Sequence, residues 1–199
     1  MSFVTATVSE VLYASTAAGA SLSSFTTEAQ LNTSATMGAA PQIPTNFWLP
    51  APTAVGKGIK ILARGTLGTT SSAPTYTVSI RGGAINNITT TPQICVTPAI
   101  TPAVSLTAAP WRLEADIYLS AIGTGGGLNS TIRVYGEFIL AGASSGGTAS
   151  IYPVYATGTA ATTSIQTDTT NYLAVNVACG TSNAANTFAL NQLEVFGLN

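Results

Sequence analysis

Hydrophobic and polar residues alternate along most of the chain with a period of two. The alternation is clearest at 57–67, 74–83, 110–120, 130–140 and 171–180, and the last segment, 187–199, carries apolar residues on both faces. Successive side chains of a β-strand point to opposite faces, so this period indicates strands that each bury one face. Helical periodicity is nearly absent, and only residues 26–31 would allow a turn or two of helix. The pattern therefore predicts an all-β protein.

Turn-forming clusters separate these segments. They read GTTSSAP at 68–74, GTGGG at 123–127, GASSGG at 142–147 and GTSNAAN at 180–186. Eight to ten strands punctuated in this way, with no helices available for parallel crossovers, are typical of antiparallel architectures. We expect an antiparallel β-sandwich of jelly-roll-like form.

The domain organisation follows from length and proline content. A chain of 199 residues without a linker suits one domain, and we assign the β-sandwich to residues 46–199. Residues 1–45 are expected to form an extended N-terminal arm or first strand that packs on the domain or on a neighbour. Four prolines in 41–52 exclude a central strand there, and we expect Phe47 and Trp48 to cover one end of the core.

The chain carries very little charge. Charged residues make up 7% of the sequence, against about a quarter in ordinary proteins, and the net charge is −1. Such a surface has too little positive charge to indicate binding of nucleic acid. No apolar run approaches the roughly 18 residues of a membrane helix. Weak self-repulsion favours association, so we expect a packed assembly without nucleic-acid or membrane partners. The first ten residues lack the features of a secretory signal, which favours assembly in the cytoplasm.

Residues able to perform chemistry are few. The chain has no histidine, Cys95 and Cys179 are far apart, and Asp116 and Asp168 are its only aspartates, so we expect no metal and no cofactor. Ser144 occupies the serine position of a G-x-S-x-G pattern, but without a histidine base the segment is interpreted as a loop. GTGGGL at 123–128 is likewise interpreted as a hairpin loop, because no helix follows it to bind a phosphate.

The segment PWRLEADIYLS at 110–120 concentrates charge on one strand face. Arg112, Glu114 and Asp116 alternate with apolar residues that should build the core. Glu114 and Asp116 would lie about 7 Å apart, a spacing compatible with glycoside hydrolysis. A glycosidase acid, however, needs a desolvated pocket that raises its pKa.

The next strand offers a structural explanation for this row. If it pairs as a hairpin, Arg133 and Glu137 join Arg112, Glu114 and Asp116, and opposite charges across a hairpin fix strand register. We interpret these five residues as a register lock or a polar patch at a subunit contact, and expect a protein that is not an enzyme. Tyr118 and Tyr135 leave carbohydrate binding open as an alternative.

Four segments resemble a family of β-rich virion structural proteins from tailed bacteriophages. They are VTATVSEVLYAS, FWLPAPTAVGKGIKILARGTLGT, PWRLEADIYLS and ANTFALNQLEVFGLN, which together run from about residue 4 to the last residue. The resemblance implies a jelly roll without catalytic residues, located on the virion. The first role that it implies is a decoration (cement) protein on the capsid, and the second is a tail or fibre component that binds a receptor or carbohydrate.

This role sets expectations for the partners. The major capsid protein or another virion protein would be bound, and affinity would come from repeated contacts and avidity. Oligomers of this kind usually close by cyclic symmetry, and a trimer suits the local threefold points of a capsid. We therefore expect a homotrimer.

Overall fold

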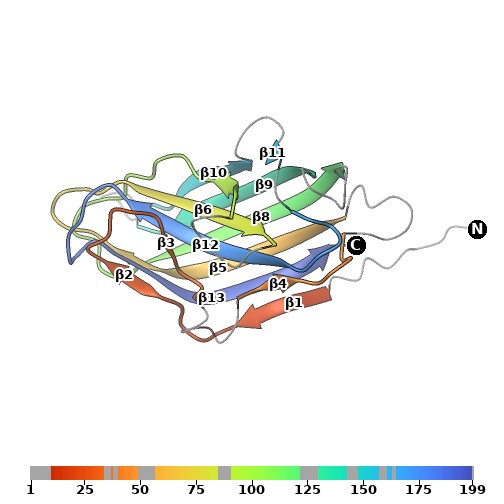
Figure 1. The fold of residues 1–199 in the computed structure, drawn as a ribbon. Coiled ribbons are helices and arrows are strands. Elements are labelled where there is room, and N and C mark those ends of the chain that lie inside the picture. The colour runs from red at the N-terminus through yellow and green to blue at the C-terminus, as the bar shows by residue number, and fades with distance from the viewer. Residues whose placement is uncertain are drawn as a thin grey trace, which may run out of the picture.

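The computed structural model describes residues 10–33, 37, 40–48, 57–84, 91–121, 130–142, 148–156, 161–162 and 165–198. Across these ranges, thirteen strands form one antiparallel sheet that curls into a half-barrel (Figure 1). The all-β, antiparallel prediction is confirmed. The sheet is continuous, however, and is not divided into the two separate sheets of a sandwich.

Each segment expected from its apolar pattern forms a strand. The strands are β1 (Glu10–Ser15), β2 (Ser21–Ser23), β3 (Ala29–Gln30), β4 (Gln42–Ile43), β5 (Gly58–Gly68), β6 (Tyr76–Gly83), β7 (Gln93–Val96), β8 (Ala109–Ala121), β9 (Thr131–Leu140), β10 (Ser150–Ala156), β11 (Ala161–Thr162), β12 (Asn171–Cys179) and β13 (Thr187–Leu198). The helical turn allowed for residues 26–31 is wrong, because β3 lies within that stretch and pairs with β12.

Strand β10 makes the sheet continuous. The strand order is β1-β13-β5-β8-β9-β10-β7-β6-β12-β3, with β2 also on β13, β4 also on β12 and β11 also on β9. Residues 150–154 of β10 pair with β9, whereas Tyr155 and Ala156 pair with β7. The strand thus passes from one half of the curl to the other, which explains why the halves remain one sheet.

The N-terminal segment is built into both halves. Strands β1 and β2 pair with β13, and β3 and β4 pair with β12 of the same chain. The buried Asn32 side chain accepts a hydrogen bond from Val175 N (2.7 Å) and donates one to Leu173 O (3.0 Å). Glu28 forms an ion pair of 2.6 Å with Arg81 on β6. These contacts attach the described part of residues 1–45 to the rest of the chain.

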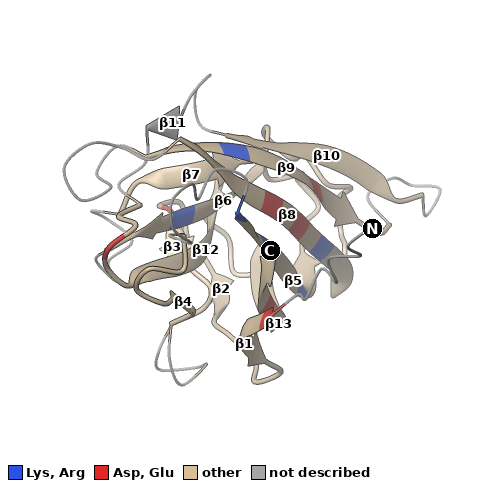
Figure 2. Ribbon diagram, turned by 90° about the vertical axis from the view of Figure 1, so that its right-hand side faces the viewer, with Lys and Arg blue, Asp and Glu red and all other residues tan. Residues whose placement is uncertain are grey.

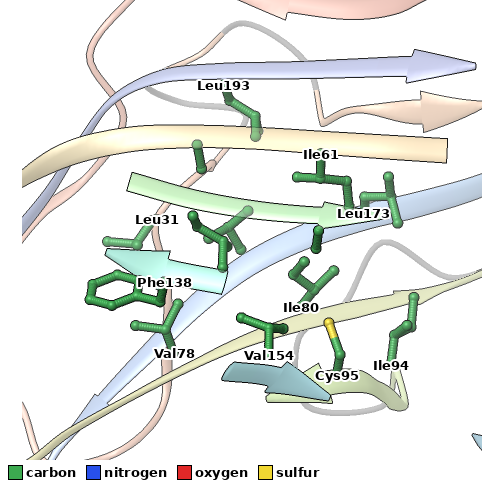
Figure 3. Close-up of a cluster of buried hydrophobic side chains, with 14 of the residues drawn as sticks. Leu31, Ile61, Val78, Ile80, Ile94, Cys95, Phe138, Val154, Leu173 and Leu193 are labelled. Carbon is green, nitrogen blue, oxygen red and sulfur yellow. The ribbon is translucent and has the colours of Figure 1, made fainter. Parts of the chain in front are cut away.

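The core fills the inside of the curl. Leu193 and Ile61 from one half face Ile80 and Val78 from the other (Figure 3). An aromatic cluster of Trp111, Phe138, Phe188 and Tyr76 joins β8, β9, β13 and β6, with ring centroids 5.0–6.4 Å apart. The buried Phe47 and Trp48 belong to this core, as expected, and Cys95 and Cys179 are buried free thiols.

Candidate functional site

The outer face of β5, β8, β9 and β10 carries the residues singled out from the sequence. On β8, the inner row from Trp111 to Leu119 is buried as predicted, while Arg112, Glu114 and Asp116 point outward. The predicted hairpin with β9 is present, with Glu114 opposite Glu137 and Tyr118 opposite Arg133. Figure 2 shows the charged bands gathered on β8 and its neighbours, beside an uncharged β10. This face is therefore the candidate site.

Ion pairs link the charged residues of this face. Lys60 Nζ on β5 lies 2.6 Å from Glu114 Oε1 and 3.6 Å from Asp116 Oδ1. Arg112 Nη2 donates a hydrogen bond of 3.1 Å to Glu137 Oε1. We call Lys60, Arg112, Glu114, Asp116 and Glu137 the charged ladder. The two positive side chains and the three negative side chains of the ladder neutralise most of one another's charge within a single chain.

The ladder also separates like charges that strand register brings together. Glu114 faces Glu137 across β8 and β9, and Arg64 faces Arg112 across β5 and β8. Like charges directly opposite each other destabilise a strand pair. Here Glu114 turns to Lys60 and Glu137 turns to Arg112. Arg64 donates instead to Gln192 on β13 (3.1 Å), so each side chain finds a partner away from its like-charged neighbour.

The ion pair fixes the protonation states of Glu114 and Lys60. The hydrogen bond from Lys60 is the main cause that holds the pKa of Glu114 below its ordinary value of 4.5. The same hydrogen bond raises the pKa of Lys60 above 10.5. A general acid of a glycosidase needs the opposite shift, towards a raised carboxyl pKa. Glu114 is thus placed as a paired carboxylate and lacks the environment of a proton donor.

Four of the five residues singled out from the sequence belong to the ladder, and the fifth does not. The side chain of Arg133 forms no ion pair or hydrogen bond with any residue in the described ranges, and Arg133 lies opposite Tyr118 in the strand pair. Lys60 was not among the five, although its alternation placed it on a polar strand face. Its proximity to β8 could not be inferred, because β6 and β7 lie between β5 and β8 in the chain.

Next to the ladder, the outer face is apolar. Ile151 on β10 pairs directly with Ile139 on β9, and Pro153 pairs with Glu137. Ile151 is 64% exposed, an unusual exposure for an isoleucine in a strand. We call Ile139, Ile151 and Pro153 the β9–β10 patch. Proline lacks the backbone N–H that a central strand needs for pairing on both sides. Pro153 is compatible with its position because residues 150–154 of β10 pair with β9 alone among the described strands.

A shallow depression lies at the other end of β9. It has a volume of about 380 Å³ and is lined by Ala156 and by residues 132–135 of β9. Tyr135 is 61% exposed there, and its ring meets that of Tyr118 edge-on at 6.4 Å. A second depression, of about 410 Å³, lies at the far end of β5 and is lined by residues 105–108 together with Gly68, Thr69, Ala185 and Thr187. Neither depression contains a carboxylate.

Ser144 and residues 123–128 lie outside the described ranges. Over the ranges that are described, no three His, Cys, Asp or Glu side chains gather where they could hold a metal ion. No helix in those ranges is long and apolar enough to span a membrane.

Comparisons with protein-family models, with curated proteins and with solved structures find no match for this chain.

Proposed function

We propose that the chain is a non-enzymatic virion structural protein of the jelly-roll type, a decoration (cement) protein that binds the outer surface of a phage capsid. The observation that carries this proposal is the outer face, where a charged ladder with internal ion pairs borders an exposed apolar patch. A face of this kind suits a protein partner with a neutral surface. The major capsid protein is the proposed partner.

The energetics of the two parts of the face support a docking role. Exposed ion pairs contribute little affinity, but they spare a partner from supplying matching charges. The β9–β10 patch supplies apolar area, which is the main source of affinity in protein interfaces. A modest contact repeated over a shell would reach high total affinity through avidity. Cyclic closure into a trimer would multiply the contact at each threefold point of the shell.

The segments that resemble phage virion proteins are neighbours in the sheet. They contain β1, β5, β8 and β13, and the strand order runs β1-β13-β5-β8 without interruption. Segments far apart in the sequence thus form one contiguous block. A shared architecture would explain such a block better than a chance match of strand-like sequences, and this supports the proposal.

The proposal can be tested by co-sedimentation of the purified protein with expanded heads of the phage that encodes it. We expect saturable binding, and we expect Ile151→Arg to weaken it at least tenfold. Val104→Arg is the matched control, because Val104 is also an exposed apolar residue (49%) but lies in the connection between β7 and β8 and is not part of the patch. A wild-type protein that stays monomeric and does not bind heads would refute the proposal. Equal losses in both variants would refute the role of the patch.

A second function, a receptor- or carbohydrate-binding jelly roll of a tail or fibre, is favoured by the exposed tyrosines beside the depression on β9. A glycan array with the wild-type protein tests it. Glycan binding together with no binding to heads would favour the tail location over the capsid.

A further inference from the structure

We infer that the depression at the Arg133 end of β9 binds a sugar that carries a carboxylate, such as a uronic acid unit of a polysaccharide. In this site Tyr135 provides the stacking surface, and Arg133 pairs with the carboxylate. The inference concerns a ligand site and does not depend on where the protein sits on a virion.

The depression forms because β9 and β10 separate. Their pairing ends where Val154 meets Gly136, and the next residue of β10, Tyr155, pairs with Val96 on β7. Strand β9 is paired on this side again only at Ile132, which meets Ala161 of β11. Between these points, residues 133–135 of β9 have no partner strand on this side within the described ranges. The two diverging strands leave the open space that Arg133 and Tyr135 line.

The ring of Tyr135 is exposed and also braced. It packs edge-on against Tyr118, and Tyr118 in turn lies against Gly58 of β5. A Cβ atom at Gly58 would come within 2.6 Å of the Tyr118 ring, so only glycine leaves room for this arrangement. Tyrosine offers a large apolar surface with a polar hydroxyl at its end and little conformational freedom to lose. These properties suit the apolar face of a sugar ring.

Arg133 gives the site its preference for an anion. Lys60, Arg81 and Arg112 each pair with a carboxylate of the same chain, whereas Arg133 has no such partner among the described residues. Its guanidinium group can bind a carboxylate through two parallel hydrogen bonds. The nearest acid across the strands is Asp116, opposite Tyr135, and Lys60 lies 3.6 Å from it. A free guanidinium beside an aromatic ring complements a sugar acid better than a neutral sugar.

The size of the site indicates a small, weakly held ligand. A volume of about 380 Å³ is near the lower end of the range for ligand pockets, and fits one or two sugar units. An open depression of this kind excludes little water, so we expect a dissociation constant of about 1 mM for a single disaccharide. Pro153, the nearest residue of the β9–β10 patch, lies opposite Glu137, which is two residues or about 7 Å along β9 from Tyr135.

The test uses the full chain and saturation-transfer NMR titrations with a glucuronate-containing disaccharide and its neutral glucose analogue. Inorganic phosphate is measured as a competitor of the acidic disaccharide. We expect the acidic disaccharide to bind at least tenfold more tightly than the neutral one. Arg133→Gln and Tyr135→Ala should each weaken that binding at least tenfold. Arg112→Gln removes the same charge from the ladder and should leave it unchanged. Thermal unfolding of each variant confirms that it is folded.

Other outcomes would overturn the inference. Equal binding of the acidic and neutral disaccharides would exclude a role for the carboxylate. Phosphate binding as tight as that of the acidic sugar would indicate a simple anion site. A loss in Arg112→Gln as large as in Arg133→Gln would place the ligand elsewhere on the face. Because Ile151→Arg leaves Arg133 and Tyr135 intact, head binding and sugar binding can fail independently.

Discussion

At the scale of single residues, the outer face combines paired charges and close backbone packing. Lys60 and Glu114 keep about 30% of their side-chain surface exposed, so water screens their attraction. The ion pair between Lys60 and Glu114 stabilises the fold only while both side chains are charged. Glu114 has a lowered pKa, so its contribution is present above pH 4.5 and is lost as the pH falls through its folded value. Lys60 has a raised pKa, so its contribution is present below pH 10.5 and is lost as the pH rises through its folded value.

The pH dependence leads to a double-mutant prediction. Lys60→Met and Glu114→Gln, alone and together, should give a coupling energy of about 0.5–1 kcal/mol in urea unfolding at pH 7. The coupling should weaken as the pH is lowered from 7 to 2, because protonation of Glu114 removes its charge. A coupling that stays the same at pH 2 would show that the contact is not an ion pair.

Gly65 leads to a second prediction at this scale. A Cβ atom there would lie 1.9 Å from Ala189 O and 2.6 Å from the ring of Trp111, whose indole covers the glycine in the core. We expect Gly65→Ala to destabilise the protein by about 2 kcal/mol or more, because the aromatic cluster must move. Gly180→Ala is the control, since its nearest neighbour would be 3.4 Å away, and it should change stability by about 0.5 kcal/mol or less. Thermal unfolding measures both, and equal effects would contradict the packing argument.

At the scale of strands, the N-terminal segment depends on side-chain contacts as well as on backbone pairing. Asn32 substitutes for a strand neighbour, because its amide satisfies both Val175 N and Leu173 O of β12. Glu28 reinforces the attachment. Burial raises its pKa, but hydrogen bonds from Arg81 and Ser79 outweigh that effect and hold the pKa below the ordinary value. The segment is therefore part of the sheet and stabilises the edge of β12.

Replacement of Asn32 tests this attachment. Asn32→Leu leaves a buried N–H and a buried carbonyl without partners, and each costs about 1–3 kcal/mol. We expect a loss of about 2 kcal/mol or more in urea unfolding, together with faster proteolytic cleavage near β3. Thr45→Ala removes only an exposed hydroxyl contact and should behave like the wild type. Unchanged proteolysis in Asn32→Leu would show that other contacts hold the segment.

Strands with local patterns could be predicted from the sequence, and strands that depend on distant partners could not. The sequence predicts the long strands β5, β8, β9 and β12, because apolar and polar residues alternate along each of them over nine or more residues. Strands β3, β4 and β11 have two residues each, which is too short for any period. Their existence depends on β12 and β9, which are distant in sequence. The curl of the sheet likewise depends on β10 changing partners, and no local signal reports such a change.

At the scale of the whole molecule, the candidate site was predictable in part. The β8–β9 hairpin and its charged row follow from sequence, because strands that are consecutive in the chain commonly pair with each other. Lys60 enters the site through the non-sequential pairing of β5 with β8, so its partner could not be named. The β9–β10 patch was missed because Ile139 and Ile151 look like core residues until their outward direction is known. Sequence composition predicts an association-prone surface, and the fold shows where apolar side chains are exposed on one face.

The proposed function implies a specific arrangement of copies on a particle. The β9–β10 patch should face the capsid shell. A homotrimer at the local threefold points would present three patches at once, so that weak single contacts become a stable attachment.

Electron cryomicroscopy of heads incubated with the purified protein tests this account most directly. We predict density for the curled sheet on the outer surface of the shell, at the local threefold positions, with Ile139, Ile151 and Pro153 against the major capsid protein. Heads without added density, or density on the tail alone, would contradict the account.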